Sequence, residues 1–321
     1  MTDEPAKVTL ARDLDEIHDS RRRHARRAAQ GVETRVGCGA YVDTAAWESL
    51  GRREQYLVRI RAAADTRLHR PVISHWSAAA VHDIPSLDPW PSTVHFTVGL
   101  TAGGRSSGVV TRHSMKLTDD DVVEVDGMLV TSIARTLVDL AAAAPLLSSV
   151  VALDHALHVD RRGGAPPRAT IDELWSRYAA LMPFRAHARA RDAIEFATTR
   201  ADSPLESVSR VNMRVIGCPR PVLQQRFDDH RGLIGFSEFF WEDAALVGEA
   251  DGRSKYTDPR FRGGRTLEEV LLDEKERADR IRALGPDVSR WGWSTGLRPE
   301  ALRRHLAAAG LPMGRSWAAT D

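Results

Sequence analysis

The chain has few cysteines and no long hydrophobic run. Its 321 residues include two cysteines, Cys38 and Cys218, which lie far apart and outside any CxxC pair. This spacing excludes a zinc ribbon and is typical of proteins in a reducing compartment, so a cytoplasmic location is expected. No segment approaches about twenty uninterrupted apolar residues, and the first nineteen residues contain acids without an apolar signal core. We therefore expect neither a membrane span nor secretion.

The chain also lacks a strong net charge of either sign. Its formal net charge is +1, with 42% hydrophobic and 28% charged residues, which is an ordinary globular composition for a chain long enough to hold two or three domains. This average hides an uneven distribution, because residues 21–27 read RRRHARR. A basic cluster of this kind is typical of a nucleic-acid-binding surface even where the net charge is small.

The arginines of this cluster fall on one side of a predicted helix. Arg22 and Arg26 are one turn apart, as are Arg23 and Arg27, so a helix here would carry a basic stripe. In a complex with double-stranded DNA this helix would lie in the major groove. The alternative is that the arginines form an ordinary solvated helix face.

A small hairpin is predicted directly after the basic helix. Ser20 is a candidate N-cap and Gly31 a candidate terminator, and residues 34–42 then read as two short strands around a Gly-x-Gly turn. A shorter helix is expected upstream, over about residues 10–18. A helix followed by a hairpin is the order of a winged helix-turn-helix, in which Arg35 of the hairpin would contact phosphate.

This N-terminal segment resembles the N-terminal domain of AbiEi-type antitoxins of abortive-infection systems. The resemblance covers some forty residues, RRRHARR and TRVGCGAYV among them. It implies a DNA-binding regulator, with a cognate toxin or a second copy of the chain as possible further partners.

The middle of the chain, residues 67–144, is predicted to be a small mixed α/β region. The segments VHFTV, GVVTRHSM, DVVEV and MLVTS read as short strands, and TSIARTLVDLAAAA reads as a capped helix after them. His75 and His82 are seven residues apart on another predicted helix, too far for a pair of metal ligands, so we expect them in the core or on a helix face. His95, Arg112 and His113 are expected at half-exposed strand positions.

Residues 145–199 are predicted to form a helical linker. The segment RRGGAPPRAT interrupts it with the Gly-Gly and Pro-Pro pairs of a turn. Asp154 is a candidate polar contact within this linker. Glu195 and Asp202 are expected on the solvated surface.

Acidic residues stand inside two apolar strand-like runs between residues 233 and 256. The runs read LIGFSEFFWEDAALVGEADGRSKY and contain Glu238, Glu249 and Asp251. An ionised carboxylate in an apolar sheet costs roughly several kcal/mol unless it is paired or bound to a cation. Three such acids in adjacent strands predict a divalent-metal site.

The pairing of the two strands decides whether these acids meet. Glu249 and Asp251 share a strand face with Val247, because successive side chains alternate. With a four-residue connection over residues 242–245, Trp241 pairs with Leu246 and Glu238 falls across from Glu249; another loop length would shift this register.

Residues 200–295 resemble the PD-(D/E)XK nucleases, in particular the branch related to very-short-patch-repair endonucleases. The matching pieces are SPLESVSR with Glu206, GFSEFFW with Glu238, VGEADGRSKY with Glu249, Asp251 and Lys255, the helix LLDEKERADRIRALG and the strand DVSRWGW. Relatives usually have Asp where Glu238 stands, and an acid-x-Lys element where this chain has Asp251.

The resemblance implies Mg²⁺-dependent hydrolysis of DNA phosphodiesters. Glu238, Glu249 and Asp251 would bind the Mg²⁺, and Glu206 would orient a water. Lys255 or Lys275 would stabilise the developing charge. Two alternatives stay open. In the first, an arginine such as Arg210 or Arg253 would neutralise Glu249, and Asp251 would end the strand in a turn. In the second, the fold would bind DNA as a regulator without turnover.

The sequence as a whole predicts an α/β protein. We expect a winged helix over residues 1–66, the mixed region over 67–144, the helical linker over 145–199 and a restriction-endonuclease-like domain over 200–321. The predicted function is DNA binding with Mg²⁺-dependent endonuclease activity, and the alternative is an inactive, antitoxin-like regulator.

Overall fold

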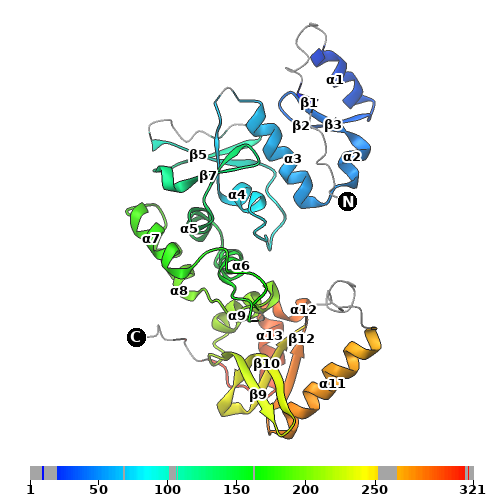
Figure 1. Cartoon of the computed structure of the whole chain (residues 1–321), viewed down its shortest axis with the longest axis vertical. Coiled ribbons are helices and arrows are strands. Elements are labelled where there is room, and N and C mark those ends of the chain that lie inside the picture. The colour runs from blue at the N-terminus through cyan, green and yellow to red at the C-terminus, as the bar shows by residue number, and fades with distance from the viewer. Residues whose placement is uncertain are drawn as a thin grey trace. The chain divides into compact units, whose positions relative to one another are not determined.

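The protein has a mixed α/β fold, as predicted (Figure 1). The computed structural model describes residues 9–10, 20–67, 69–100, 106, 108–161, 163–251, 266–314 and 317. The chain divides into two compact units: unit 1 contains Met1–Ala152 and Arg168–Phe196, and unit 2 contains Leu153–Pro167 and Ala197–Asp321.

The N-terminal part of unit 1 contains a three-stranded sheet with strand order β1-β3-β2. Its elements are β1 (Thr9–Leu10), α1 (Ser20–Ala29), β2 (Glu33–Gly37), β3 (Ala40–Asp43), α2 (Thr44–Ser49) and α3 (Arg52–Asp65). The predicted basic helix and hairpin are confirmed. A small core joins the hairpin to α3, and it includes Val36, Ala40, Val42, Val58 and Ala62.

The helix predicted over about residues 10–18 is wrong at its first residue. Leu10 belongs to β1, which pairs antiparallel with β3 and places Leu10 opposite Ala40. Pairing across the sheet outweighs the local helical pattern here, because it satisfies the strand's backbone groups. Residues 11–19 lie outside the described part of the chain.

The middle of unit 1 is a mixed five-stranded sheet with strand order β6-β5-β4-β8-β7. Its strands are β4 (Val72–Ile73), β5 (Val94–Val98), β6 (Val110–Ser114), β7 (Val122–Val125) and β8 (Met128–Thr131). The four predicted strands are confirmed, and β4 is an addition to them. The pairs β4–β8 and β5–β6 are parallel, and the other neighbours are antiparallel.

Helices complete unit 1. They are α4 (His75–Val81), α5 (Ile133–Ala143), α7 (Ile171–Leu181) and α8 (His187–Phe196), with α6 (Leu146–Leu157) at the boundary between the units. Helix α5 packs against α4, α7 and α8. It begins after Ser132, whose hydroxyl accepts a hydrogen bond from the Arg135 amide, so the predicted cap is confirmed.

Unit 2 contains a four-stranded sheet with strand order β12-β11-β10-β9. Its elements are α9 (Pro204–Val215), β9 (Val222–Asp229), β10 (Gly232–Trp241), β11 (Leu246–Ala250), α11 (Leu267–Ala283), β12 (Asp287–Trp291), α12 (Trp293–Gly296) and α13 (Pro299–Ala308). Strands β9, β10 and β11 form an antiparallel meander, and β12 joins β11 in parallel. The helix expected at LLDEKERADRIRALG and the strand expected at DVSRWGW are confirmed as α11 and β12.

The two faces of this sheet carry separate apolar clusters. Phe239 and Trp241 pack with Leu205 of α9 and Leu302 of α13, in the larger cluster. Val247 packs with Ile281 of α11 in the smaller one. The sheet is therefore covered on both faces, which explains why its strands read as continuous apolar runs.

Among the described residues, no helix combines the length and apolar character needed to cross a membrane.

Candidate functional site

The register of β10 and β11 brings two of the predicted site acids together. Trp241 pairs with Leu246, as predicted, and Phe239 pairs with Gly248. One step further along the two strands, Glu238 lies next to Glu249. Residues directly opposite each other in antiparallel strands point to the same face of the sheet. The two glutamates therefore share the face that carries Val247.

Both glutamates are buried and hydrogen-bonded. Glu238 and Glu249 are 8% and 4% exposed. The Oε2 atom of Glu238 accepts a hydrogen bond of 2.5 Å from the Ala250 amide, across the strand pair. The Oε1 atom of Glu249 accepts one of 2.9 Å from Nη2 of Arg277, which lies on α11 and also donates to the Phe236 carbonyl. These contacts offset part of the cost of burying two carboxylates.

Glu206 is connected to the same strands through a glutamine. It lies in the first turn of α9 and is 4% exposed. Its Oε2 atom accepts hydrogen bonds from the Asp202 amide at 3.0 Å and from Nε2 of Gln224 at 3.2 Å. Gln224 stands between Leu223 and Gln225, the partners of Phe239 and Ser237 in β10, so its place in β9 is next to Glu238.

The backbone of Gln224 is strained. Its φ is 56°, in the left-handed region that non-glycine residues rarely adopt inside a strand. Such a conformation costs on the order of 1–3 kcal/mol and persists only where the surroundings fix it, which is common at functional sites. The strain lies at the position that connects Glu206 to the strand carrying Glu238.

The third acid, Asp251, lies at the end of β11. Its amide donates to the Trp291 carbonyl at 2.8 Å, and its carboxylate lies 3.8 Å from Nη1 of Arg290. Lys275 is exposed on α11. Lys255 and Arg253 lie outside the described residues, so the predicted roles of these two side chains stay predictions.

The described residues contain no group of three His, Cys, Asp or Glu side chains that could hold a metal ion. The predicted three-carboxylate Mg²⁺ site at Glu238, Glu249 and Asp251 is therefore not found among the described residues, and it stays a prediction. One positive charge already lies beside Glu249, because the guanidinium of Arg277 is 2.9 Å from its carboxylate. The sequence-based alternative named Arg210 or Arg253 as the cation. Arg277 on α11 is a partner that it did not name, and Arg253 lies outside the described residues.

Arg210 has a different carboxylate partner. Asp154 of α6 is 1% exposed, and both of its carboxylate oxygens accept hydrogen bonds from Nη2 of Arg210, at 3.0 and 2.8 Å. Asp154 also accepts from the Ser207 hydroxyl and the Thr198 amide. Burial raises the pKa of Asp154, although these donors act in the opposite direction. The candidate polar contact at Asp154 is thus a buried ion pair that joins α6 to α9 within unit 2.

The two acids that were predicted to lie on the surface, Asp202 and Glu195, form exposed ion pairs, which contribute less to stability than buried ones. Asp202 is paired with Arg161 and lies 3.5 Å from His158, and Glu195 is paired with Arg191 one turn away on α8. Both acids are on the surface, as predicted. Exposed pairs of this kind contribute about 0–1 kcal/mol.

Helix α1 of unit 1 carries the predicted basic residues on its exposed surface. Arg22, Arg23, Arg26 and Arg27 are all exposed, whereas His24 is buried. The imidazole of His24 stacks on the ring of Tyr41 in β3 with 5.1 Å between ring centroids, and its Nδ1 atom lies 2.7 Å from Glu33. A buried histidine thus holds the helix to the hairpin and leaves the arginines outside.

Arg27 of the stripe is paired with an acid of the hairpin. The Nε atom of Arg27 donates to Oε1 of Glu33 at 2.7 Å, beside the contact from His24. Burial alone would raise the pKa of Glu33, but the hydrogen bonds from His24 and Arg27 outweigh it and lower the pKa. Arg35 in β2 is exposed, and its Nε atom donates to the Gly37 carbonyl at 3.1 Å.

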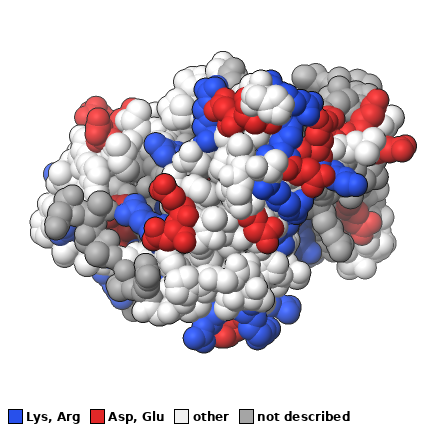
Figure 2. Space-filling model, turned by 90° about the horizontal axis from the view of Figure 1, so that it is seen from below, with Lys and Arg blue, Asp and Glu red and all other residues white. Residues whose placement is uncertain are grey.

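Charges of both signs are mixed on the face shown in Figure 2. Figure 2 shows one face of the molecule, on which Lys and Arg side chains lie beside Asp and Glu side chains rather than in a field of their own. The small net charge reflects this mixing. Local arginine groups such as that on α1 are therefore the features that distinguish one surface from another.

The sequence did not predict that three histidines of the mixed region meet. The rings of His75 and His113 stack with 3.5 Å between centroids, and Nδ1 of His95 lies 3.0 Å from Nε2 of His113. Burial lowers the pKa of His95 and of His113 to about 4 each, and that of His75 further below its usual range. The half-exposed strand positions predicted for His95 and His113 are confirmed; the parallel pairing of β5 with β6 is what brings them together.

A buried ion network lies beside these histidines. Arg135 is completely buried and pairs with Asp139 at 2.9 Å and with Asp121 at 3.0 Å. Asp139 Oδ2 lies 3.9 Å from Nδ1 of His75. Burial raises the pKa of Asp139 to about 6, although Arg135 acts in the opposite direction. The spacing Arg-x-x-x-Asp in the predicted helix was the available indication of the first pair.

Comparisons with known proteins give two relatives of limited coverage. No protein-family model matches the chain. The "Uncharacterized protein MT2308" of Mycobacterium tuberculosis (strain CDC 1551 / Oshkosh) and the "Uncharacterized protein Rv2248" of strain ATCC 25618 / H37Rv are each 28% identical to it over 161 residues. The aligned part is 50% of this chain and 54% of each relative, so the chain spans about half the length of the curated relatives it matches.

Proposed function

We propose that the protein binds double-stranded DNA through α1 and the β2–β3 hairpin. The observation that carries this proposal is the way in which α1 is held: His24 is buried against Tyr41, and the arginines on either side of it in the sequence are exposed. A helix that is held to the protein by one buried face and is basic on its exposed face can insert into a major groove of DNA. The adjacent hairpin can then contact the DNA backbone.

The resemblance to AbiEi-type antitoxins supports the same function. In that interpretation Arg22, Arg23 and Arg26 contact phosphates or base edges, and Arg35 of the hairpin contacts phosphate. Arginine is suited to both roles, because its guanidinium forms bidentate hydrogen bonds with phosphate oxygens and with guanine. Arg27 has to leave Glu33, or share its guanidinium with it, before it contacts DNA.

Single substitutions distinguish these roles. We expect Arg22→Ala, Arg23→Ala, Arg26→Ala and Arg27→Ala to weaken binding, and at least two of them to weaken it equally on two unrelated duplexes, which is the behaviour of a phosphate contact. Losing one such contact should also make the negative slope of log K against log salt shallower by about 0.9. Arg191→Ala on α8 is the matched control. Wild-type affinity and slope in all four variants would show that α1 faces solvent.

A second candidate function is DNA cleavage, and a specific observation favours it. The register places Glu238 beside Glu249 on one sheet face, with Glu206 connected to the neighbouring strand through Gln224. The resemblance to PD-(D/E)XK nucleases assigns catalysis to these acids. Against cleavage stands the Arg277 guanidinium, which lies 2.9 Å from Oε1 of Glu249 and would compete with a cation for that oxygen.

Incubation with supercoiled plasmid separates the two candidates. For binding without turnover we expect no nicking by the purified chain in Mg²⁺, in Mn²⁺ or in chelator. Nicking that requires a divalent metal and disappears in Glu249→Gln, with unchanged circular dichroism, would establish the nuclease instead. Nicking that persists in Glu249→Gln would indicate a contaminant.

A further inference from the structure

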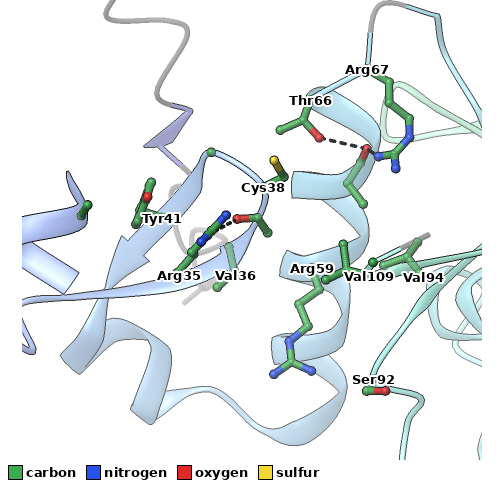
Figure 3. A pocket seen from close by; sticks show the side chains of 15 residues that line it. Arg35, Val36, Cys38, Tyr41, Arg59, Thr66, Arg67, Ser92, Val94 and Val109 are labelled. Atoms are coloured by element: carbon green, nitrogen blue, oxygen red, sulfur yellow. Dashed lines mark hydrogen bonds between the residues drawn. The ribbon is translucent and has the colours of Figure 1, made fainter. Parts of the chain in front are cut away.

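A basic cleft opens in unit 1 next to the proposed DNA-binding helix (Figure 3). It has a volume of about 1090 Å³ and is lined by parts of the hairpin, of α3 and of the edge of the five-stranded sheet. Ala25 of α1 and Arg35 of β2 line it together with Arg59 of α3 and Arg67, which lies just beyond the end of α3. The cleft thus begins where the proposed DNA-binding surface ends.

The three arginines of the cleft have no acidic counterpart there. The lining contains no Asp or Glu, and no ion pair involves Arg35, Arg59 or Arg67 among the described residues. The contrast with α1, where Glu33 pairs with Arg27, is direct. The cleft therefore holds positive charge that the described part of the chain does not balance.

Aromatic rings hold two of these guanidinium groups in place. The Arg59 guanidinium lies over the Trp47 ring at 5.3 Å from the centroid, and that of Arg67 lies over the Phe96 ring at 4.8 Å. Cation–π contacts fix the side chains without using their N–H groups. Nη1 of Arg67 also donates to the Ala63 carbonyl, and the remaining N–H groups of both side chains can donate to a further acceptor. Burial lowers the pKa of Arg67, and the neighbouring Arg112 lowers it further, which an anion beside it would reverse.

The rest of the lining permits close approach of a ligand. Gly39 and Gly108 adopt positive φ angles of 70° and 58°, and a side chain at Gly108 would point into open space. A phosphate group can approach a glycine backbone more closely than any residue with a Cβ atom. Figure 3 shows Arg35 and Arg59 on two neighbouring elements, with Cys38 at the turn of the hairpin.

We infer that this cleft binds the sugar-phosphate backbone of the duplex whose major groove α1 enters. The inference rests on the proposed function and extends the contact beyond the hairpin to Arg59 and Arg67. Charge complementarity requires an anionic occupant, and the continuity of the lining from Ala25 through Arg35 to α3 favours the same DNA molecule over a separate acidic peptide. Each arginine donates to phosphate oxygens, so the cleft positions the duplex without reading its sequence.

A double substitution tests the inference. Arg59→Gln with Arg67→Gln should make the slope of log K against log salt shallower by about 1.8, equally on two unrelated duplexes. The ratio of wild-type to variant affinity should therefore be about 12-fold smaller at 200 mM salt than at 50 mM salt, as the change of slope requires. Arg59→Lys with Arg67→Lys keeps the charge and should keep the slope, which separates lost contacts from a disturbed fold.

The matched control is Arg70→Gln with Arg191→Gln. It changes the net charge by the same amount but removes exposed arginines that are paired with Glu124 and Glu195. We expect a slope within about 0.5 of the wild type, because neither residue would contact phosphate. An equal change of slope in the control and in the cleft variant would overturn the inference, since net charge alone would then account for it.

Cys38 gives a readout that is independent of affinity. It lines the cleft and is exposed, whereas Cys218 is buried, so N-ethylmaleimide should label Cys38 selectively. A saturating duplex should slow this labelling at least tenfold, and polyglutamate at the same ionic strength should not. A chain that binds duplex with Cys38 fully reactive and an unchanged slope in the cleft variant would overturn this inference alone. Protection by polyglutamate only would assign the cleft to an acidic peptide, and absence of any duplex binding would overturn the proposed function as well.

Discussion

Arg277 provides a positive charge beside the acidic strands of unit 2. An acid in an apolar strand requires a positive charge nearby, and a metal ion or an arginine can provide it. The sequence shows Glu249 but does not show which cation faces it, because Arg277 is 28 positions away on a helix whose packing depends on the whole sheet. The Asp154–Arg210 pair has the same character, with 56 positions between its members.

Removing Arg277 should take away one positive charge that lies beside the buried Glu249 carboxylate. We expect Arg277→Gln to lower the free energy of unfolding by about 1–3 kcal/mol, since Arg277 is partly exposed and water can replace some of its contacts. Arg277→Gln combined with Glu249→Gln should recover part of the loss. Urea unfolding followed by circular dichroism measures both. Recovery of stability by Mg²⁺ in the single variant would instead show that the acids bind a cation and would favour the nuclease.

The three stacked histidines should make the fold sensitive to acid. Burial lowers the pKa of His95 and of His113 from 6.5 to about 4, so the unfolded chain binds more protons than the folded one between these values. Stability is therefore fully present above pH 6.5 and falls as the pH decreases toward 4. Asp139 acts in the opposite direction below about pH 6, because its pKa is raised and the folded chain takes up its proton first.

Substituting one histidine isolates this effect. His113→Asn should make the pH dependence of the unfolding free energy between pH 6 and 4.5 shallower by about 1.4 kcal/mol per pH unit, the contribution of one proton. Urea titrations at several pH values measure the slope, whatever the substitution does to stability at pH 7. An unchanged slope would mean that His113 titrates alike in the folded and unfolded chain.

At the scale of elements, local chemistry predicted more than it missed. The end of α1, the hairpin after it and the cap of α5 follow from Gly31, from the Gly-x-Gly turn and from Ser132, all of which act within a few residues. Ser20, the predicted N-cap, is instead the first residue of α1. The strand at Leu10 was missed because its pairing partner in β3 is thirty positions away. Strand β4 was missed because it is only two residues long, and its pairing partners lie in the distant strands β5 and β8.

Strand β11 is packed too closely for any side chain at Gly248. An added Cβ would lie 2.7 Å from the Trp291 ring and 2.9 Å from the Trp241 ring, both in the larger cluster of unit 2. Gly248→Ala should therefore cost about 1–3 kcal/mol of stability. Ser237→Ala on the adjacent strand is the control, because its buried hydroxyl has no hydrogen-bond partner in the described part of the chain and its loss should be neutral or stabilising. Thermal unfolding of both variants gives the comparison, and equal stability of Gly248→Ala and the wild type would show that the tryptophans shift freely.

At the scale of the whole molecule, the proposed DNA-binding features and the acidic strands belong to different compact units. Binding and cleavage are therefore separable: substitutions on α1 should alter affinity without changing the stability of unit 2, and Arg277→Gln should do the reverse. The sequence predicted both regions from local residue patterns. It did not predict the basic cleft, because Arg35, Arg59 and Arg67 come from three separate segments that only the fold of unit 1 brings together.

The salt dependence of duplex binding by the intact chain tests the central claim most directly. Fluorescence anisotropy of a labelled duplex, titrated at several salt concentrations, gives the slope of log K against log salt. Phosphate contacts from at least two arginines of α1 and from Arg35 predict a slope of about −2.7 or steeper, and phosphate contacts in the cleft would steepen it further. Absence of binding at low salt, or a slope near zero, would contradict the proposal that this protein binds DNA through its basic helix.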